Sequence, residues 1–319
     1  MRILKKTNID FLSKRKIAYV FSALLILASL ISLILHGGPR YSIDFQGGTF
    51  IHVKFLDNQD STKALDIDVS KVRTSLTEIG LSGSEIKHYG SLQDIGIRVA
   101  EKDQYEGMIN DVITTLEKSF PGTHVIEMAK ETVSAKVGTE LVWMAIKAIL
   151  FASFFILVYV MFRFEFRFSL GAVLALFHDV IITLGVFSVF NVEISLPVIA
   201  AFLTIVGYSL NDTIVVYDRI RENMKSLKKN VNMKIMQESM NRSINETLSR
   251  TLVTSLTTLL VVIILLFFGG EVLFSFAFAL TVGIMIGTYS SVFVASPVVL
   301  ELQKRLAMPA KSKNKGKSK

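Results

Sequence analysis

The sequence has no cysteine and little charge: only 19% of its 319 residues are Asp, Glu, Lys or Arg. Without cysteine, neither a disulfide framework nor a thiolate metal site is possible. Soluble domains usually carry about 25% charged residues, and here the charges are also spread unevenly, because long stretches have almost none. Together with a mean hydropathy of +0.49, this pattern is typical of an integral membrane protein.

The net charge of +8 does not indicate a nucleic-acid partner. Lysines and arginines gather in short links and at both ends of the chain instead of on one folded surface. The sequence also contains no Walker loop, dinucleotide fingerprint, HExxH or GxSxG motif. We therefore expect no nucleic-acid binding, no enzyme activity and no cofactor.

Six apolar stretches are long enough to cross a membrane, because about 20 apolar residues span about 30 Å of hydrocarbon. The first stretch follows a basic leader. It exceeds the roughly 7–15 residues of a signal-peptide core, so we expect an uncleaved anchor. The stretches are 17–35, 138–162, 170–190, 194–216, 251–268 and 272–296.

Basic residues predict how these stretches are oriented, because cytoplasmic loops are enriched in Lys and Arg. Residues 1–16 carry six such residues and the loop 217–250 carries eight, whereas the turns 191–193 and 269–271 carry none. We therefore expect both termini, including a solvated lysine-rich tail at 297–319, to lie in the cytoplasm. The region 36–137 then lies outside it.

The region 36–137 is long enough for one small folded core. Alternating and helical apolar periodicities predict the order β-α-β-β-α-β, which is that of an α+β ferredoxin-like fold. This fold hosts many functions, so it indicates none of them. Four of the five histidines lie here at scattered spacings, which gives no metal site. The predicted elements are strands at 49–55, 85–89, 95–99 and 124–128, helices at 69–79 and 105–120, and a hairpin turn at 90–94.

Two acids lie inside the apolar stretches, where ionisable residues are costly and usually functional. Asp212 is about 8 Å from the cytoplasmic end of the fourth stretch, and Asp179, after His178, is about 15 Å into the third. Arg250 opens the fifth stretch on the same side. An acid that alternates between a dry setting and one with water or arginine can carry a proton. The alternative is a static buried pair that only fixes helix packing.

The polar segments around these acids allow more than one interpretation. Hydroxyls of the fifth stretch, such as Thr254 and Thr258, either bond their own helix or line a hydrated path. The loop 217–250 is expected to form a helical hairpin or an amphipathic segment. Its basic residues are expected to meet anionic lipid headgroups.

Four segments resemble the signature motifs of the SecF proteins in the SecD/SecF family, which is related to RND transporters. Residues 206–223 (VGYSLNDTIVVYDRIREN) and 241–255 (NRSINETLSRTLVTS) are long, linked matches. Residues 41–49 (YSIDFQGGT) and the His178-Asp179-Val180 triplet are shorter ones. The resemblance covers about residues 40 to 300.

The resemblance implies half of an RND-like bundle in the bacterial cytoplasmic (inner) membrane, with SecD supplying the other half. It implies use of the proton motive force to promote protein export through the SecYEG channel. The implied partners also include YajC, YidC, the exported polypeptide and anionic lipids. The alternatives are a stand-alone RND-like exporter of lipids or small molecules, and a non-transporting assembly scaffold.

The resemblance also assigns roles to individual residues. It implies proton transport at Asp212, with Arg250 as its partner across the fourth and fifth stretches. From their place in or beside the same stretches, we also expect Asn211, Asp179, His178, Thr254 and Thr258 to take part in proton transport. A structural or coupling role is implied for Gly47, Gly48, Gly207, Asp218 and Arg219.

Overall fold

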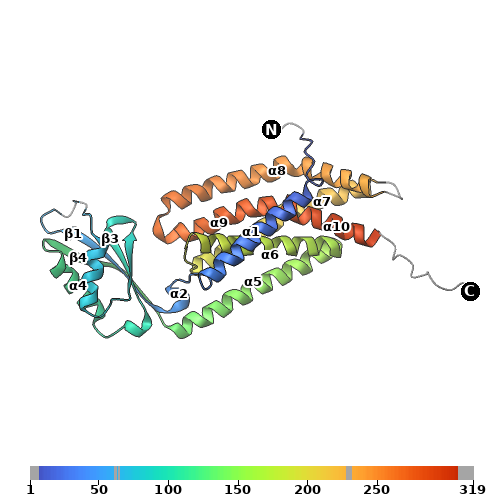
Figure 1. The fold of residues 1–319 in the computed structure, drawn as a ribbon. Helices are drawn as coiled ribbons and strands as arrows, with labels where there is room; N and C mark the ends of the chain where they lie inside the picture. The colour runs from blue at the N-terminus through green and yellow to red at the C-terminus, as the bar shows by residue number, and fades with distance from the viewer. Residues whose placement is uncertain (1–6, 61–62, 64, 228–231, 308–319) are drawn as a thin grey trace, which may run out of the picture.

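The computed structural model describes residues 7–60, 63, 65–227 and 232–307. A bundle of long helices occupies one end of the molecule and a small sheet domain the other (Figure 1). The prediction of six spans is confirmed, because six helical segments are long and apolar enough to cross a membrane. They are α1 (Arg15–Leu35), α5 (Ala135–Arg163), α6 (Phe166–Val189), α7 (Leu196–Lys225), α8 (Met233–Phe268) and the segment that begins with α9 (Gly270–Ser290).

The helices continue beyond the predicted apolar stretches at the end of the bundle opposite the sheet. α7 and α8 both extend into the loop expected at 217–250, so that loop is largely a helical hairpin. α9 passes through a π-helical turn, Ser291–Ala295, into α10 (Ser296–Ala307). The first residues of the predicted tail, 297–307, are thus helical. Burial of Val299 and Leu300 in the bundle holds this helix in place. The lysine-rich part of the predicted tail lies outside the described residues.

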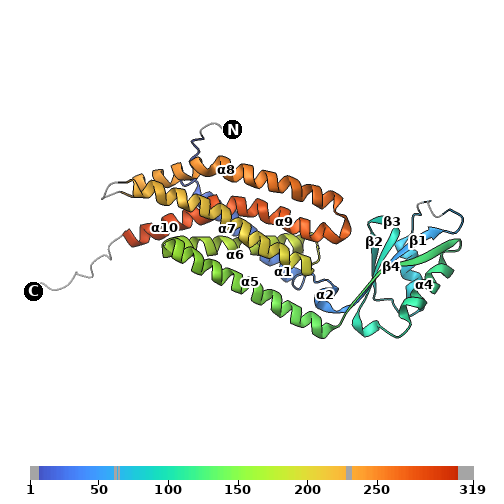
Figure 2. The ribbon, with the colours of Figure 1, turned by 180° about the vertical axis from the view of Figure 1, so that it is seen from behind.

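The sheet domain has the predicted ferredoxin-like order, with both helices on one face of a four-stranded antiparallel sheet arranged β2-β3-β1-β4 (Figure 2). Its core forms where alternate residues of β1 (Ile51, Val53 and Phe55) meet apolar residues of both helices. The elements are β1 (Gly48–Asp57), α3 (Val69–Glu78), β2 (Glu85–Tyr89), β3 (Ser91–Val99), α4 (Met108–Ser119) and β4 (Thr123–Val133).

Three local features of the domain differ from what the sequence predicted. The hairpin turn expected at 90–94 is a tight turn at Gly90, whose φ of +86° suits glycine, and β3 already begins at Ser91. β4 is longer than the predicted 124–128, because it pairs with β1 along its whole length. The short helix α2 (Ile43–Gln46) was not predicted. It lies at the junction between the domain and the bundle.

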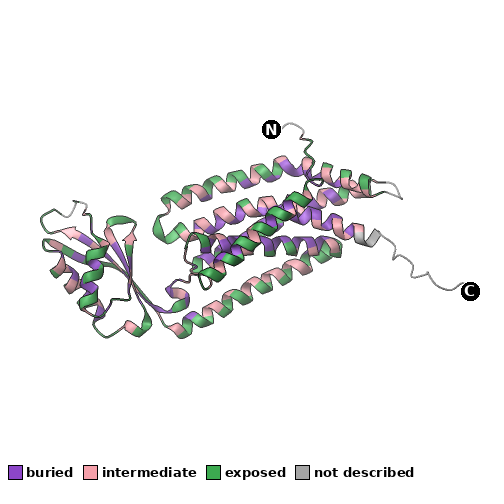
Figure 3. Ribbon diagram, in the orientation of Figure 1, coloured by how far each residue is buried: buried purple, intermediate pink, exposed green. Residues whose placement is uncertain are grey.

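The bundle is packed around α6 and α7, about half of whose apolar segments is buried, while α5 and α8 remain largely exposed (Figure 3). Glycines allow the central helices to approach closely. A Cβ added at Gly185 of α6 would lie 2.0 Å from Ser29 Oγ of α1, and one at Gly283 of α9 would lie 2.3 Å from Ile205 of α7. Small residues at helix contacts are usual in membrane bundles. The exposed helices leave large faces for lipid or partners.

The segment 41–49 joins the sheet to two helices of the bundle. Asp44 Oδ2 accepts the Leu196 backbone N–H at 2.8 Å and so caps α7, whose own N-cap residue Ser195 makes no side-chain cap. Gly47, at φ +76°, lies against α5, where an added Cβ would be 2.6 Å from the Ala135 nitrogen. The domain is therefore fixed to the first turns of α5 and α7.

A cluster of charged side chains reinforces this junction. Glu193, in the turn before α7, pairs with Arg98 of β3, with Arg40 at 3.1 Å and with Lys87 at 3.6 Å. Burial by itself raises the pKa of Glu193. The hydrogen bond and charge of Arg98, helped by Lys87 and Arg40, outweigh burial and hold the pKa below its ordinary value of 4.5. The ion-pair cluster therefore stabilises the docked domain when Glu193 is ionised.

We predict that Gly47→Ala destabilises the protein by about 2–4 kcal/mol, because it combines backbone strain with steric overlap. Gly107→Ala is the matched control, since Gly107 also has positive φ (+84°) but nothing lies within 4 Å of an added Cβ. Its cost should be about 1 kcal/mol. Thermal unfolding of the detergent-solubilised variants measures both losses. Equal losses at the two positions would contradict the proposed role of the contact with α5.

We also predict that acid loosens the junction. A lowered folded pKa means that the stabilisation is complete above about pH 4.5 and is lost as the pH falls through the folded value. Charged hydrogen bonds of this kind contribute about 1.5–3 kcal/mol. A dye pair at His124→Cys and Phe190→Cys, in this cysteine-free chain, should report separation of domain and bundle between pH 7 and about pH 3. Glu193→Gln should remove that pH step, and an unchanged step would count against Glu193.

Candidate functional site

Asp212 lies in the interior of the bundle with only 3% of its surface exposed. It is carried by α7, whose apolar residues on the same face place it between α8 and α9. Ser255 Oγ of α8 donates a hydrogen bond to Asp212 Oδ2 at 3.2 Å, and Thr288 Oγ1 of α9 donates to Ser255 Oγ at 2.8 Å. A single carboxylate is thus linked through hydroxyls to the two neighbouring helices.

Arg250 does not contact Asp212 directly, so the expected pairing is not an ion pair in this structure. Among the described residues, no nitrogen of Arg250 lies within 4.0 Å of a carboxylate oxygen. The helical repeat explains this: Arg250 precedes Ser255 by five residues, which turns it about 140° away from the face that meets Asp212. The Arg250 side chain is exposed, and its charge acts on Asp212 over a longer distance.

Asp179 forms a second polar centre deeper in the same bundle, with 1% of its surface exposed. His178 Nδ1 lies 2.8 Å from Asp179 Oδ1, while Ser209 Oγ and Ser290 Oγ donate to Oδ2 at 2.6 and 2.8 Å. The other His178 ring nitrogen lies 3.0 Å from Ser22 Oγ. The pair therefore joins four helices, α1, α6, α7 and α9, and a buried acid with this many partners is well satisfied.

The two acids belong to one polar layer, although no hydrogen bond within the described ranges links their networks. Ser209 and Asp212 are three residues apart on α7, so they lie on neighbouring turns of one helix face. On α9, Thr288 serves Asp212 and Ser290 serves Asp179. The layer is built from carboxylates, an imidazole and hydroxyls, which is a suitable set for moving protons.

Four other predicted site residues do not join Asp212. Thr254 and Thr258 donate to carbonyls of their own helix, Arg250 O and Thr254 O, at 2.9 and 3.0 Å. Asn211 and Gly207 are exposed on α7, and nothing lies within 4 Å of a Cβ added at Gly207. These two residues mark a face of α7 that the described part of the chain leaves uncovered.

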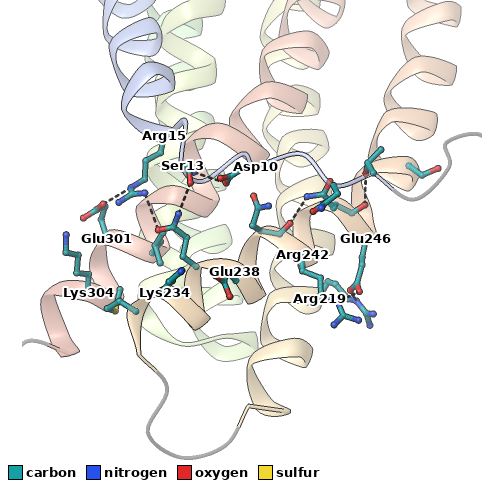
Figure 4. Close-up of a pocket in the computed structure, with 18 residues that line it drawn as sticks. Asp10, Ser13, Arg15, Arg219, Lys234, Glu238, Arg242, Glu246, Glu301 and Lys304 are labelled. Atoms are coloured by element: carbon teal, nitrogen blue, oxygen red, sulfur yellow. Dashed lines mark hydrogen bonds and ion pairs between the residues drawn. The ribbon is translucent and has the colours of Figure 1, made fainter.

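Asp218 and Arg219 fix the extension of α7 at the end of the bundle away from the sheet domain. Asp218 Oδ1 pairs with Arg163 of α5 at 2.9 Å, and Arg219 Nε pairs with Glu246 of α8 at 2.6 Å. Next to them, a groove of about 1180 Å³ runs between α8, α10 and residues 7–13 (Figure 4). Because these basic side chains have protein carboxylates as partners, the expected contact with anionic headgroups remains a prediction.

Sequence reasoning missed Ser22, Ser209 and Ser290 as partners of the His178–Asp179 pair. A serine in an apolar stretch gives little signal on its own, because it also packs well between membrane helices. Only the crossing of α1, α7 and α9 over α6 brings these hydroxyls together. In the described part of the chain, no three His, Asp or Glu side chains are grouped to hold a metal ion.

Comparison with known proteins places the chain in a family. A family model described as "Protein export membrane protein SecD/SecF, C-terminal" matches residues 112–305. Protein translocase subunit SecF of Rhodothermus marinus is 49% identical over 318 residues, which covers 96% of this chain and 97% of that protein. The SecF of Vibrio alginolyticus is 42% identical and covers 99% of this chain and 97% of that protein.

The solved structures agree with the sequence matches. The crystal structure of SecDF from Thermus thermophilus, titled a translocon-associated membrane protein, superimposes with a TM-score of 0.80 at 38% identity. The match covers 94% of this chain but 39% of the SecDF chain, so this protein spans about two-fifths of that structure. The chain therefore belongs to the SecD/SecF family of protein-export membrane proteins, and its likeness to SecF subunits extends over nearly its whole length.

Proposed function

We propose that this chain acts with a SecD-type partner to use the proton motive force for protein export through the SecYEG channel. The observation that carries the proposal is Asp212, a carboxylate buried within a membrane-spanning helix and held by the Ser255 hydroxyl, with no contacting cation among the described residues. Placing an ionisable side chain inside a membrane costs free energy, and residues placed there are usually functional.

The open face of α7 supports a SecD-type partner. Gly207 and Asn211, one turn apart on α7, are exposed next to Asp212, at a level where a lone membrane protein would present them to lipid. Small and polar residues suit a closely packed helix–helix contact. The SecDF structure contains further chain beyond the matched two-fifths, which is room for a second bundle half. Helices of that half would complete the surroundings of Asp212, and Arg250 would then be able to act as its partner.

The proposed orientation places both termini in the cytoplasm and residues 36–137 outside, in agreement with the basic residues of the links. The sheet domain would then meet the exported polypeptide as it leaves the channel. YajC, YidC and anionic lipids belong to the same proposal as further partners of the assembled complex.

The contacts of α7 provide a route from proton to domain. When Asp212 is ionised, it holds the Ser255 hydroxyl of α8; a protonated Asp212 accepts that bond less strongly and loses its attraction to Arg250. The spacing of α7 and α8 then changes. Because Asp44 caps α7 at Leu196, and Glu193 holds β3 through Arg98, a displacement of α7 moves the sheet domain. Asp179 and His178 would provide a second protonation site in the same layer.

The strongest alternative is an RND-like exporter of lipids or small molecules that works without the Sec channel. Purification from native membranes separates the two: the proposed function requires SecD and SecYEG to accompany the chain. A non-transporting scaffold is the other alternative. It requires both Asp212→Asn and Arg250→Lys to leave export intact.

We predict that Asp212→Asn lowers proton-driven export at least about tenfold while the protein still assembles, because asparagine keeps the size and the Ser255 hydrogen bond but cannot be ionised. Export into vesicles loaded with a proton gradient measures the loss. Glu222→Gln is the control on the same helix, since Glu222 is an exposed ion-pair partner of Arg219 and should change export less than twofold. Unchanged proton-driven export in Asp212→Asn would refute the proposed function.

We predict a different result for Asp179→Asn. This change leaves an amide in a site with three hydrogen-bond partners, so it should slow proton flux several-fold and destabilise the bundle by about 1–3 kcal/mol. Ser290→Ala should cost a similar stability while retaining the acid. Proton flux and thermal unfolding are measured on both variants. If flux falls equally in the two, Asp179 is a packing residue and not a proton carrier.

A further inference from the structure

The segment Thr7–Ser13, here called the strap, crosses the bundle at the end opposite the sheet domain and leads into α1 (Figure 4). It lies against the first half of α8, the part of that helix that precedes Arg250. The proposed proton chemistry gives the strap no role. It also gives none to the asparagines of the 241–255 motif, which contact it.

Two asparagines one turn apart on α8 bind the strap by its backbone. Asn241 Oδ1 accepts the N–H groups of Phe11 at 2.8 Å and Leu12 at 3.3 Å, and Asn241 Nδ2 donates to Ile9 O at 2.8 Å. Asn245 Oδ1 accepts the Ile9 N–H at 2.9 Å, and its Nδ2 also donates to Ile9 O at 2.8 Å. Each side-chain amide therefore bonds the strap backbone through both its donor and its acceptor.

The far side of the strap is anchored in the rest of the bundle. Leu12 is fully buried and Phe11 is nearly so, with its ring 5.5 Å from that of Phe293 in the π-helical turn. Immediately after the strap, Arg15 pairs with Glu301 of α10 at 2.9 Å. The strap thus ties α8 to α1 and α10. α8 makes little contact with these helices otherwise, because it packs mainly on α7 and α9.

The strap forms one wall of the groove, and a separate ligand bound in the groove is poorly supported. The groove carries charges of both signs, and several of them neutralise each other: Arg219 and Arg242 both pair with Glu246. A groove of paired charges offers little attraction to an anionic or a cationic ligand. The uncharged asparagines, by contrast, each make hydrogen bonds with the strap through both the oxygen and the nitrogen of the side-chain amide.

The position of the strap matters because α8 is one continuous helix from Met233 to Phe268. Asn245 precedes Arg250 by five residues and Ser255 by ten, about 8 and 15 Å along the axis. A shift or rotation of this part of α8 therefore moves both residues that act on Asp212. The strap fixes the helix about three to four turns from the Ser255–Asp212 hydrogen bond.

We propose that Asn241 and Asn245 are positioning residues, which clamp the strap to α8 and so set the place of Ser255 and Arg250 relative to Asp212. The inference rests on the proposed proton function of Asp212 and adds to it a mechanical control from the strap. With the strap docked, α8 is held where Ser255 reaches the carboxylate. With the strap released, the cytoplasmic half of α8 is free to move away.

The charged and titratable groups around Asp212 determine what a pH measurement reports. Arg250 comes from α8, His178 and Asp179 come from α6, and α9 contributes Tyr289 beside the hydroxyls of Thr288 and Ser290. The clamp moves only the α8 groups. Releasing it should therefore change the pH dependence of proton flux without changing the groups that α6 and α9 present.

The test compares the double variant Asn241→Ala/Asn245→Ala with the wild type, each full-length and reconstituted with its partner subunit. Hydrogen exchange should show lost protection of the Ile9, Phe11 and Leu12 amides. Spin labels at Ile235→Cys and Phe166→Cys, both exposed and both at the end of the bundle where the strap lies, should report an altered distance between α8 and α6. The pH at half-maximal proton flux should move by about half a unit or more, because Asp212 loses partners that favour its charged form.

Glu238→Gln is the matched control, since Glu238 lines the same groove on the same helix and should leave all three measurements unchanged. A rescue completes the design. Gln237 Nε2 donates to Ser13 Oγ at 3.2 Å, so a short thiol cross-linker between Ser13→Cys and Gln237→Cys should hold the strap again. In the double variant it should return the flux profile toward wild type.

Persistent amide protection, an unchanged α8–α6 distance, or lower flux without a shift in its pH midpoint would each overturn the proposal. The last result would show that the asparagines only support folding. Failure of the proposed function is distinguishable, because it appears as proton flux retained by Asp212→Asn with the strap docked.

Discussion

The structure depends on one constraint, the cost of keeping ionisable side chains inside a bundle that lipid surrounds. For Asp179 this cost is offset by hydrogen bonds with an imidazole and with two hydroxyls from other helices. Asp212 has one hydroxyl partner and a more distant arginine. An acid with many donors is held in one arrangement, and an acid with few can change its protonation at lower cost. We therefore expect the protonation of Asp212 to change more readily than that of Asp179.

Much of the architecture was predictable from the sequence, because it follows from periodicity and composition. The apolar stretches predicted the six spans, and the alternation around Ile51 and Ile97 predicted the central strands of the sheet. Asp212 was identifiable because a lone acid in an apolar stretch is rare. The hydrogen-bond partners of the buried acids were harder to predict. In the sequence Ser209 and Ser290 resemble ordinary packing residues, and only the crossing of the helices brings them to Asp179.

Contacts between distant segments account for most of what was not predicted. The bond from Asn241 to the strap joins residues 230 positions apart, and the bond from Asp44 to α7 spans 152 positions. Neither pairing leaves a periodic signal, although both asparagine and aspartate lie in segments that resemble family motifs. For Arg250, by contrast, a contact was expected that the structure of this chain does not contain. The resemblance implies a partnership with Asp212, but the helical repeat turns the side chain to another face in this chain alone.

The junction between β4 and α5 has a consequence for how the sheet is oriented. β4 ends at Val133 and α5 begins at Ala135, so a single residue, Ser134, separates the edge of the sheet from a membrane helix. α5 has 29 residues, about 43 Å of helix against about 30 Å of hydrocarbon, so part of its length must be taken up by tilt or by projection beyond the bilayer. A thinner bilayer increases that tilt and a thicker one reduces it. Because only Ser134 separates them, the orientation of the sheet follows the tilt of α5. The thickness of the surrounding bilayer is therefore one of the factors that set the orientation of the domain relative to the membrane.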